Sequence, residues 1–419
     1  MIAATKEHTG KTSVSMALLS GLIARFGVEN VGYIKPVGQK WVPVPDDSGE
    51  VLQVDKDVKV AREHWGLTCN YRDMSPLVLD KGYTRRYLDG QVDISKQFAA
   101  IQQAFDNMLS QKQVVIVEGT GHTGVGSIVG CNNADVAAVL GIGVVLVANG
   151  GLGSTYDELE LNRQMCMSKG VPVSGVIINK ASSDKLAATR KNLSLALRPW
   201  GVPLIGAVPS ADSLDVPSVN DLETLFGVRA LNADALLRGR GGGALRRFTR
   251  FELVTAALRS FMDHLNDPAV DCSQTCFVTH ASRHDIILGL LSHAAEASAD
   301  ADARPFQGGL MLTGSPPGNI PDNYMLEYIR DSDMPVLSVG LSTTQALARM
   351  EGFTPKMNAA DTERTAAVVR HYAPHLDVEA LLTLMGGGRA ATEGGPIMPH
   401  IAPTIPLGAA LGGLGEGLP

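Results

Sequence analysis

The tripeptide Gly10-Lys11-Thr12 has the residue types and the spacing that could bind the phosphates of a nucleotide. It lies between an apolar stretch, residues 1–5, and a helical pattern over residues 13–26. In a strand–loop–helix context, backbone N–H groups and the helix N-terminus hold phosphates, while a lysine and a hydroxyl complete the site. We therefore expect Lys11 to reach the β- and γ-phosphates and Thr12 to ligate Mg²⁺. A turn with a purely structural role is the alternative interpretation.

The elements that must position this loop are indicated by the pattern of residues 1–225, where short apolar runs alternate with amphipathic segments. The apolar runs, which are rich in β-branched residues, are 33–37, 114–119, 144–150 and 173–180. Residues 93–111 and 154–170 have the periodicity of helices. Apolar strands separated by helices predict a doubly wound, mostly parallel α/β sheet with its ligands at the carboxyl ends of the strands.

A second, smaller α/β domain is expected after a linker. Residues 226–269 combine a Gly/Arg-rich loop at 236–247 with one helix at 250–265. The second domain is predicted over 270–385, and residues 386–419, rich in Gly, Pro and Ala, are expected to be a disordered tail. The strands of the second domain are expected at 275–280, 308–314 and 334–340.

The composition of the 419-residue chain is typical of a globular protein that binds neither nucleic acid nor membrane. Hydrophobic residues make up 45%, and the net charge of −7 leaves no basic surplus to neutralise phosphates of nucleic acid or lipid. The longest apolar runs fall short of a membrane span, and no signal peptide is evident. We expect a cytoplasmic protein, or one of an organelle matrix if a leader is missing. Cys272 and Cys276 have a spacing that some metal sites use, but without a second Cys/His pair we interpret them as buried thiols.

The segment ATKEHTGKTS, residues 4–13, resembles the phosphate loop of dethiobiotin synthetase and its relatives, in which G-T-x-x-x-x-G-K-T is usual. Ala4 replaces the leading glycine, which alanine can do if that residue keeps a negative φ. The resemblance implies ATP and Mg²⁺ as cofactors, and the preference for adenine follows from it alone. The loop residues implied to bind the nucleotide are Thr5, Lys6, Thr9, Gly10, Lys11, Thr12 and Ser13.

Further motifs follow in the same order as in those enzymes. YIKPVGQ implies that Lys35 lies near the γ-phosphate or the substrate, and VEGTGHTGVGS implies that Glu118 points toward the metal. DKDVKVA resembles their acidic segment, with Asp57, or less favourably Asp55, as a Mg²⁺ ligand. Phosphoryl transfer needs positioning and charge stabilisation, which lysines and metal-binding carboxylates supply. The implied catalytic residues are Lys11, Lys35 and Glu118, and the implied metal ligands are Thr12, Asp57 and Glu118.

The segments that receive the base in those enzymes are matched by INKA, residues 178–181, and by residues 206–219. The resemblance implies Asn179 and Pro209 as the contacts of the base. Each motif alone has another interpretation, because Glu118 could be a solvated strand end and Asn179 a helix cap.

Lys6 raises a further hypothesis because it lies five residues before Lys11. This is the spacing of the signature lysine in the partitioning and septum-positioning ATPases, where that lysine reaches the partner's nucleotide across a dimer. The resemblance implies a homodimer. A surface lysine on a loop is the alternative.

The chain to about residue 385 resembles a dethiobiotin-synthetase-like domain followed by a DRTGG domain. This pair occurs at the N-terminus of long phosphotransacetylases and as stand-alone proteins. Ser315 stands where the second glycine of the T-G-G turn would be, and Arg283, His284 and Asp285 form either a polar cluster or caps of the following helix. The segments that carry the resemblance are 82–90, 119–127, 149–162, 278–291 and 310–319.

Three functions are compatible with these patterns. The first is a regulatory or sensory Mg-ATP-binding protein with slow hydrolysis and a protein partner. The second is an ATP-dependent ligase that phosphorylates a small carboxylate or carbamate, which Lys35 and Glu118 favour. The third is a scaffold subunit with a vestigial nucleotide site, suggested by Ala4 and the short first strand. Acetyl transfer to phosphate is not expected, because no segment after residue 385 could encode the phosphotransacetylase catalytic domain.

Overall fold

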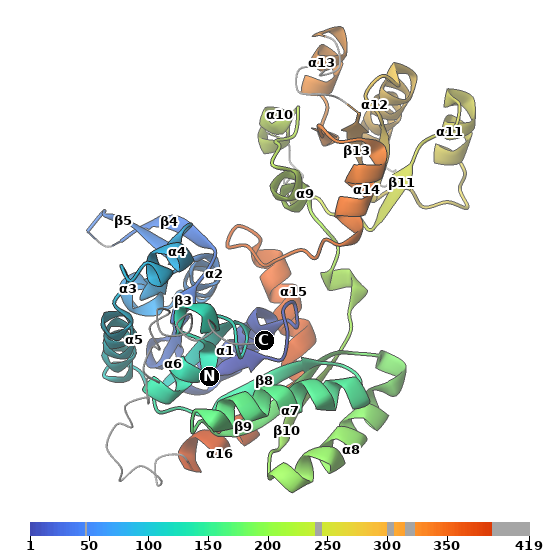
Figure 1. Ribbon diagram of the computed structural model, residues 1–419. Helices are drawn as coiled ribbons and strands as arrows, with labels where there is room; N and C mark the ends of the chain where they lie inside the picture. Colours follow the sequence, from blue (N-terminus) through green and yellow to red (C-terminus); the bar gives the residue numbers. More distant parts are fainter. Residues whose placement is uncertain (47, 239–244, 300–305, 315–322, 388–419) are drawn as a thin grey trace, which may run out of the picture. The chain divides into compact units, whose positions relative to one another are not determined.

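The computed structural model describes residues 1–46, 48–238, 245–299, 306–314 and 323–387, which form two compact units (Figure 1). The first unit comprises Met1–Ser210 and the chain from Thr365 onward, and the second comprises Ala211–Arg364. Each is an α/β structure built on a parallel sheet, so the predicted fold class is confirmed.

A six-stranded parallel sheet forms the centre of the first unit, in the order β10-β9-β8-β1-β7-β2. Its strands are β1 (Ile2–Ala4), β2 (Val31–Ile34), β7 (Val114–His122), β8 (Val144–Asn149), β9 (Val173–Ala181) and β10 (Leu204–Pro209). Five of them correspond to the predicted apolar stretches, although β2 lies slightly earlier than the run at 33–37, and β10 was not predicted as a strand. Because β1 is central, the loop after it lies at the carboxyl edge of the sheet, with strand ends on both sides.

Helices surround this sheet, and α1 follows β1 directly. Its buried residues include Val14, Leu18 and Leu22, whose spacing of four places them on one face. The helices before the second unit are α1 (Lys11–Phe26), α2 (Lys56–Trp65), α3 (Tyr71–Met74), α4 (Tyr83–Leu88), α5 (Ile94–Leu109), α6 (Asn133–Val139), α7 (Gly153–Ser168) and α8 (Leu186–Leu197). Two small strand pairs complete this part: β3 (Val37–Gly38) with β6 (Leu77–Val78), and β4 (Trp41–Pro45) with β5 (Val51–Asp55).

The chain that follows the second unit packs on the first unit, which differs from the expected domain over 270–385. We call residues 365–387 the returning segment; it contains most of α15 (Thr362–Tyr372) and all of α16 (Val378–Gly387). Leu376 forms an antiparallel bridge with Gly206 of β10, and the Asp377 N–H donates to the Ile205 carbonyl at 2.9 Å. The sequence pattern gave no sign of this packing, because the bridge joins residues 170 positions apart in the chain.

The second unit has a four-stranded parallel sheet in the order β11-β12-β13-β14. Successive residues of a strand point to opposite faces of the sheet, and each face packs against its own hydrophobic cluster. Phe277 belongs to one cluster and Val278 to the other. The strands are β11 (Arg250–Leu253), β12 (Thr275–His280), β13 (Gly309–Thr313) and β14 (Val336–Ser338). The helices are α9 (Val219–Phe226), α10 (Ala233–Arg238), α11 (Leu258–Leu265), α12 (His284–Ala299), α13 (Asn323–Arg330) and α14 (Thr343–Glu351).

The segment expected to be a linker, 226–269, belongs to this second unit, which begins at Ala211 rather than after residue 225. The helix predicted at 250–265 is a strand followed by a helix, because Arg250 and its neighbours pair with β12 and α11 begins only at Leu258. Ser315, most of the tail predicted at 386–419 and part of the Gly/Arg-rich loop lie outside the described residues. Within the described ranges, none of the helices has the length and apolar character needed to cross a membrane.

Candidate functional site

The loop between β1 and α1 has the backbone geometry of an anion-binding turn. Gly10, the residue directly before α1, is left-handed with φ 88° and ψ 30°. The Thr9 hydroxyl donates to the Lys6 carbonyl at 2.6 Å and closes the turn. Because Gly10 has no side chain to cap the helix, the N–H groups of the first turn of α1, which includes Ser13, need an external acceptor.

Ala4 fits the position of the usual glycine without strain. It lies in β1, is fully buried, and pairs in parallel with Val147 of β8. Among the described residues other than glycine, positive φ angles occur only at His8 and Lys180, so Ala4 keeps a negative φ. The replacement of glycine by alanine therefore leaves the loop able to form.

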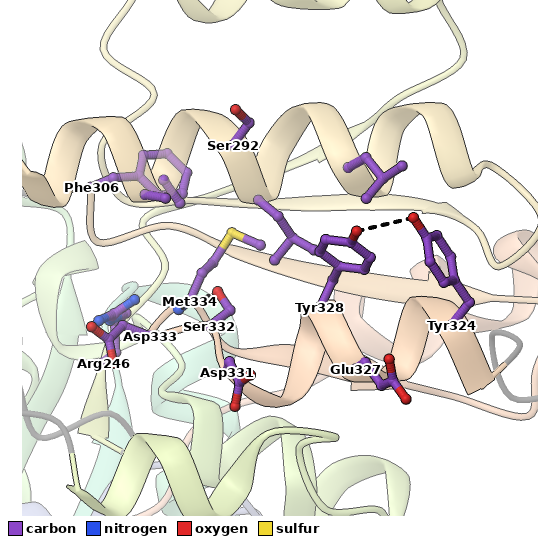
Figure 2. A pocket seen from close by; sticks show the side chains of 14 residues that line it. Arg246, Ser292, Phe306, Tyr324, Glu327, Tyr328, Asp331, Ser332, Asp333 and Met334 are labelled. Carbon is purple, nitrogen blue, oxygen red and sulfur yellow. Dashed lines mark hydrogen bonds between the residues drawn. The ribbon is translucent and has the colours of Figure 1, made fainter.

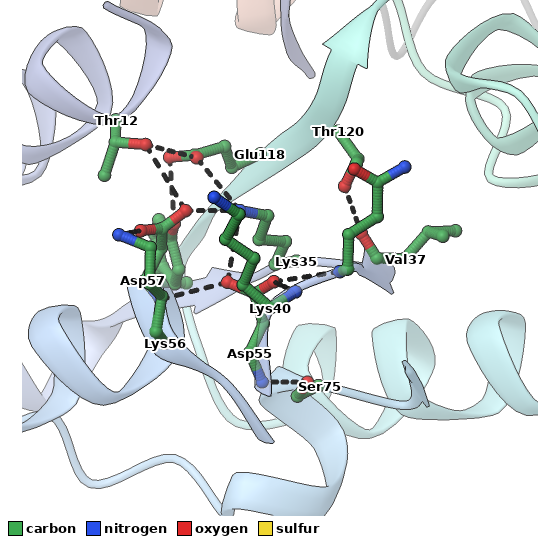
Figure 3. A network of polar contacts seen from close by, with 12 residues as sticks. Thr12, Lys35, Val37, Lys40, Asp55, Lys56, Asp57, Ser75, Glu118 and Thr120 are labelled. Carbon is green, nitrogen blue, oxygen red and sulfur yellow. Dashed lines mark hydrogen bonds and ion pairs between the residues drawn. The ribbon is translucent and has the colours of Figure 1, made fainter. Parts of the chain in front are cut away.

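Three carboxylates and one lysine converge beside the first turn of α1 (Figure 3). The Thr12 hydroxyl donates to Glu118 Oε1 at 2.9 Å and lies 3.5 Å from Asp57 Oδ2. Lys35 Nζ contacts Asp57 Oδ2 directly and lies 3.1 Å from Asp55 Oδ1 and 3.7 Å from Glu118 Oε1. Lys35 follows β2, Glu118 lies on β7 and Asp57 lies in the first turn of α2, so the carboxyl edge of the sheet brings together groups far apart in sequence.

Asp55 and Asp57 have different positions in this network. Asp55 is the N-cap of α2, and its side chain accepts from the Asp57 N–H at 3.0 Å and from the Gln39 N–H at 3.2 Å. Only Asp57 also contacts Thr12. The geometry therefore agrees with Asp57 as the better metal-ligand candidate of the two.

Burial and ion pairing set the protonation of this cluster. Burial lowers the pKa of Lys35, but Asp57, Glu118 and Asp55 outweigh it and raise the pKa above its ordinary value. Burial raises the pKa of Asp57, yet Lys35 and Lys56 hold it below the ordinary range. Burial also raises the pKa of Glu118, with Lys35 opposing. The Lys35 ammonium thus lies charged among carboxylates, in the kind of position that a divalent cation takes.

Tyr33 is a member of this network that the sequence analysis missed. It is fully buried on β2, and its hydroxyl donates to Glu118 Oε2 at 2.8 Å. Burial raises its pKa well above the ordinary value, so the hydroxyl remains a donor. The available signal was its position two residues before Lys35, because alternate residues of a strand face the same side.

Replacing Tyr33 by phenylalanine is expected to lower the free energy of unfolding by about 1–3 kcal/mol, because Glu118 Oε2 would lose its donor in a buried site. Urea unfolding measures the loss. Tyr71→Phe is the matched control, since the Tyr71 hydroxyl lies outside this cluster, beside Arg62 and at a long 3.5 Å from Glu63, and should cost less. Equal losses in the two variants would contradict the role given to Tyr33.

Lys6 pairs within its own chain. Its Nζ lies 2.9 Å from Glu158 Oε1, and the Thr5 hydroxyl donates to Glu158 Oε2 at 3.1 Å. One turn further along α7, the Asn162 side chain donates to the Thr5 carbonyl at 3.1 Å. Glu158 and Asn162, neither of which the sequence analysis identified, therefore tie the start of the phosphate loop to α7.

The two residues expected to receive a base lie on the other side of β1. Asn179, fully buried at the end of β9, donates to the Thr9 carbonyl at 2.8 Å. The Pro209 carbonyl, at the end of β10, lies 2.9 Å from Nε2 of His371 in the returning segment. Asn149 ends β8, and its buried side-chain oxygen has no hydrogen-bond partner among the described residues. Asn179 thus contacts the phosphate loop itself, a contact that the sequence did not indicate.

Comparison with known proteins agrees with this geometry. A family model described as an AAA domain matches residues 1–218. The chain belongs to this family. The chain is 30% identical over 220 residues to the ATP-dependent dethiobiotin synthetase of Aromatoleum aromaticum, covering 52% of this chain and 93% of that protein.

The similarity to phosphate acetyltransferases continues beyond the AAA domain. The chain is 24% identical over 397 residues to the phosphate acetyltransferase of Nitratidesulfovibrio vulgaris, covering 91% of this chain and 50% of that protein. For the phosphate acetyltransferase of Nitrosomonas europaea the identity is 25% over 398 residues, covering 92% and 51%. The chain therefore spans about half the length of these two relatives. The similarities to both groups that the motifs indicated are confirmed.

Substituting Gly10 of the AAA domain by alanine is expected to disrupt the phosphate loop. A Cβ there would lie 2.3 Å from Asn179 Nδ2, in addition to the left-handed φ. Gly141→Ala is the matched control, because Gly141 also has a positive φ, 63°, but nothing within 4 Å of an added Cβ. Thermal unfolding should show a loss of roughly 1–2 kcal/mol for the control and about 1–3 kcal/mol more for Gly10→Ala. Equal losses of unfolding free energy in the two variants would contradict the close approach of Asn179 to Gly10.

The second unit, outside the AAA domain, carries a separate cavity of about 950 Å³. Figure 2 shows Tyr324 and Tyr328 hydrogen-bonded to one another at one end of it, with Arg246 and Asp333 at the opposite end. The residues at 283–285 lie elsewhere: Arg283 pairs with Asp285 at 2.8 Å, and His284 begins α12. Cys272 and Cys276 are buried free thiols, as expected.

Proposed function

We propose that this protein binds Mg-ATP in its AAA domain and acts as a slow ATPase with a regulatory or sensory role. The observation that carries the proposal is the placement of Thr12, at the first turn of α1, within hydrogen-bonding distance of Glu118 and beside Asp57. A phosphate loop, a hydroxyl and two carboxylates are the parts that a P-loop nucleotide site requires.

The residues present fit a magnesium ion that arrives with the nucleotide. Thr12, Asp57 and Glu118 offer hard oxygen ligands, and Mg²⁺ usually combines one or two carboxylates with phosphate oxygens and waters. Consistent with this, the described part of the chain contains no group of three or more His, Cys, Asp or Glu side chains arranged to hold a metal alone. When bound, the ion would neutralise charge on the phosphates.

The lysines have separate tasks in this proposal. Lys11 begins α1 and would contact the β- and γ-phosphates, and burial lowers its pKa although Glu118 opposes this effect. Lys35 neutralises the carboxylates of Asp55 and Asp57. Its ammonium would be placed to contact the γ-phosphate or an acidic substrate. The unpartnered oxygen of Asn149 fits a nucleotide too, because it offers a buried acceptor to a ribose hydroxyl or a base amino group.

The regulatory part of the proposal is supported by the similarity to phosphate acetyltransferases over 91% of the chain. We propose that the second unit is a DRTGG-like domain that contacts a protein partner, and that the protein forms a homodimer. The scaffold alternative has lost a principal support, because β1 accommodates Ala4.

An ATP-dependent ligase is the second candidate, favoured by one specific observation. Dethiobiotin synthetase of Aromatoleum aromaticum is matched over 93% of its length, and here Lys35, Asp57 and Glu118 form one cluster. Such an enzyme would transfer phosphate to a small carboxylate or carbamate held beside Lys35.

Calorimetric titration with Mg-ATP, followed by phosphate release from the same samples, tests the proposal. Binding with slow release that acetate, succinate and glutamate leave unchanged is the expected result. Acceleration by one of these acids would favour the ligase instead. If the intact protein did not bind Mg-ATP, both the regulatory ATPase and the ligase would be contradicted. The scaffold subunit with a vestigial nucleotide site would then be the remaining function.

A further inference from the structure

The direction in which a bound nucleotide must extend follows from the order of the strands. Glu118 lies on β7, Lys35 follows β2 and Asp57 follows β5, which places the terminal phosphate on that side of β1. The nucleoside must then extend in the opposite direction, over the carboxyl ends of β8, β9 and β10. These ends carry Asn149, Asn179 and Pro209.

The returning segment reaches this same edge at two points. His371 Nε2 lies 2.9 Å from the Pro209 carbonyl at the end of β10. The hydroxyl of Tyr372 lies 3.5 Å from the position that a Cβ on Gly10 would occupy, next to the amide of Asn179. His371 thus contacts a strand end on the nucleoside side, and the neighbouring Tyr372 lies close to the turn that would hold the phosphates.

The placement of these two side chains is fixed by several contacts of the segment with the first unit. Leu376 bridges to Gly206, and Val378 packs so closely on α1 that a Cβ added to Gly21 would lie 2.8 Å from its Cγ2. Tyr372 is buried and His371 half-buried. A segment anchored on both β10 and α1 presents its residues to the site in a defined geometry.

We infer that the returning segment completes the nucleotide site, with His371 as a positioning residue for the nucleoside end and Tyr372 as a positioning residue for the phosphate loop. The inference rests on the proposed nucleotide binding. Asn179 and Pro209 were expected at this edge from the sequence, whereas the two residues of the returning segment were not. His371 acts by holding the Pro209 carbonyl, and Tyr372 by packing against the Gly10 turn.

The two roles predict different ligand responses, measured by calorimetry on the full chain with Mg-ATP and with tripolyphosphate, which has no nucleoside. His371→Leu should weaken Mg-ATP binding about tenfold, as expected for one lost hydrogen bond, and leave tripolyphosphate unchanged. His371→Gln, which keeps an N–H donor, should restore most of the ATP affinity. Tyr372→Phe should weaken both ligands by the same factor.

His375→Leu is the matched control, because His375 lies in the same segment, with its ring centroid 5.9 Å from that of His371, and should change neither affinity. Thermal unfolding of every variant separates positioning from a general loss of structure. The inference is overturned if His371→Leu binds both ligands like the wild type, or loses both in parallel with a fall in melting temperature. Failure of the wild type to bind Mg-ATP would instead remove the proposed function.

Discussion

Replacing Lys11 by alanine is expected to weaken Mg-ATP binding by at least about 100-fold, because each charge-assisted hydrogen bond lost to a phosphate contributes roughly 1.5–3 kcal/mol. The variant should fold as well as the wild type. Burial lowers the pKa of Lys11, which means that holding the charged ammonium in this place costs stability rather than adding it. Calorimetric titration gives the affinity, and urea unfolding gives the stability.

Lys191→Ala is the control for this experiment, since Lys191 is exposed on α8 and far along the chain from the loop. It should leave both the affinity and the stability unchanged. If Lys11→Ala bound Mg-ATP with the affinity of the wild type, the nucleotide would occupy a site that does not involve Lys11. A large loss of stability would show that Lys11 has a structural role instead.

Replacing Lys35 by methionine is expected to lower the free energy of unfolding at pH 7 by about 3–5 kcal/mol. The substitution keeps the volume of the side chain but leaves Asp55, Asp57 and Glu118 buried without their shared cation. Chemical denaturation with urea measures the loss. Lys56→Met is the graded control, because Lys56 approaches the cluster from a more exposed position, 3.3 Å from Asp57 Oδ1, and should cost much less.

The loss in Lys35→Met should shrink as the pH falls from about 7 toward 4. In the wild type the pKa of Asp57 is depressed, so its contribution to stability is present above the unfolded pKa and is lost as the pH falls through the folded one. Without Lys35, the burial that raises the pKa values of Asp57 and Glu118 loses its largest opposing charge, although Lys56 still lowers that of Asp57. At neutral pH the buried, charged carboxylates then destabilise the folded variant. Protonation at lower pH removes their charge and with it this destabilisation. A loss independent of pH would contradict the ion-pair account.

The sequence alone determined the parts of the site that depend on local pattern. Gly10, Lys11 and Thr12 stand between an apolar strand and a helix, and a strand–loop–helix of this type has one arrangement of its backbone. Lys35 and Glu118 were assigned to the site through the resemblance of their motifs to those of dethiobiotin synthetase. Both motifs accompany apolar runs, whose parallel strands end at one edge of the sheet. The α/β fold of both units follows from the same periodicity.

Only the tertiary structure decided which side chains outside these motifs complete the site. The contact of Tyr33 with Glu118 depends on β2 lying beside β7, and the pairing of Lys6 with Glu158 depends on where α7 packs. Side-chain partners across such distances depend on the packing of elements, which local periodicity does not specify.

The returning segment is the clearest example of packing that the local sequence pattern does not specify. Its helical pattern is equally compatible with either unit, because a helix with an apolar face can pack on any apolar surface of matching shape. The sequence analysis placed residues 365–385 in the second domain, and their pattern did not indicate the unit on which they pack. The bridge between Leu376 and Gly206 attaches this segment to the first unit and brings His371 next to Pro209. The sequence determined the loop that would hold the phosphates, and long-range packing decided what surrounds it.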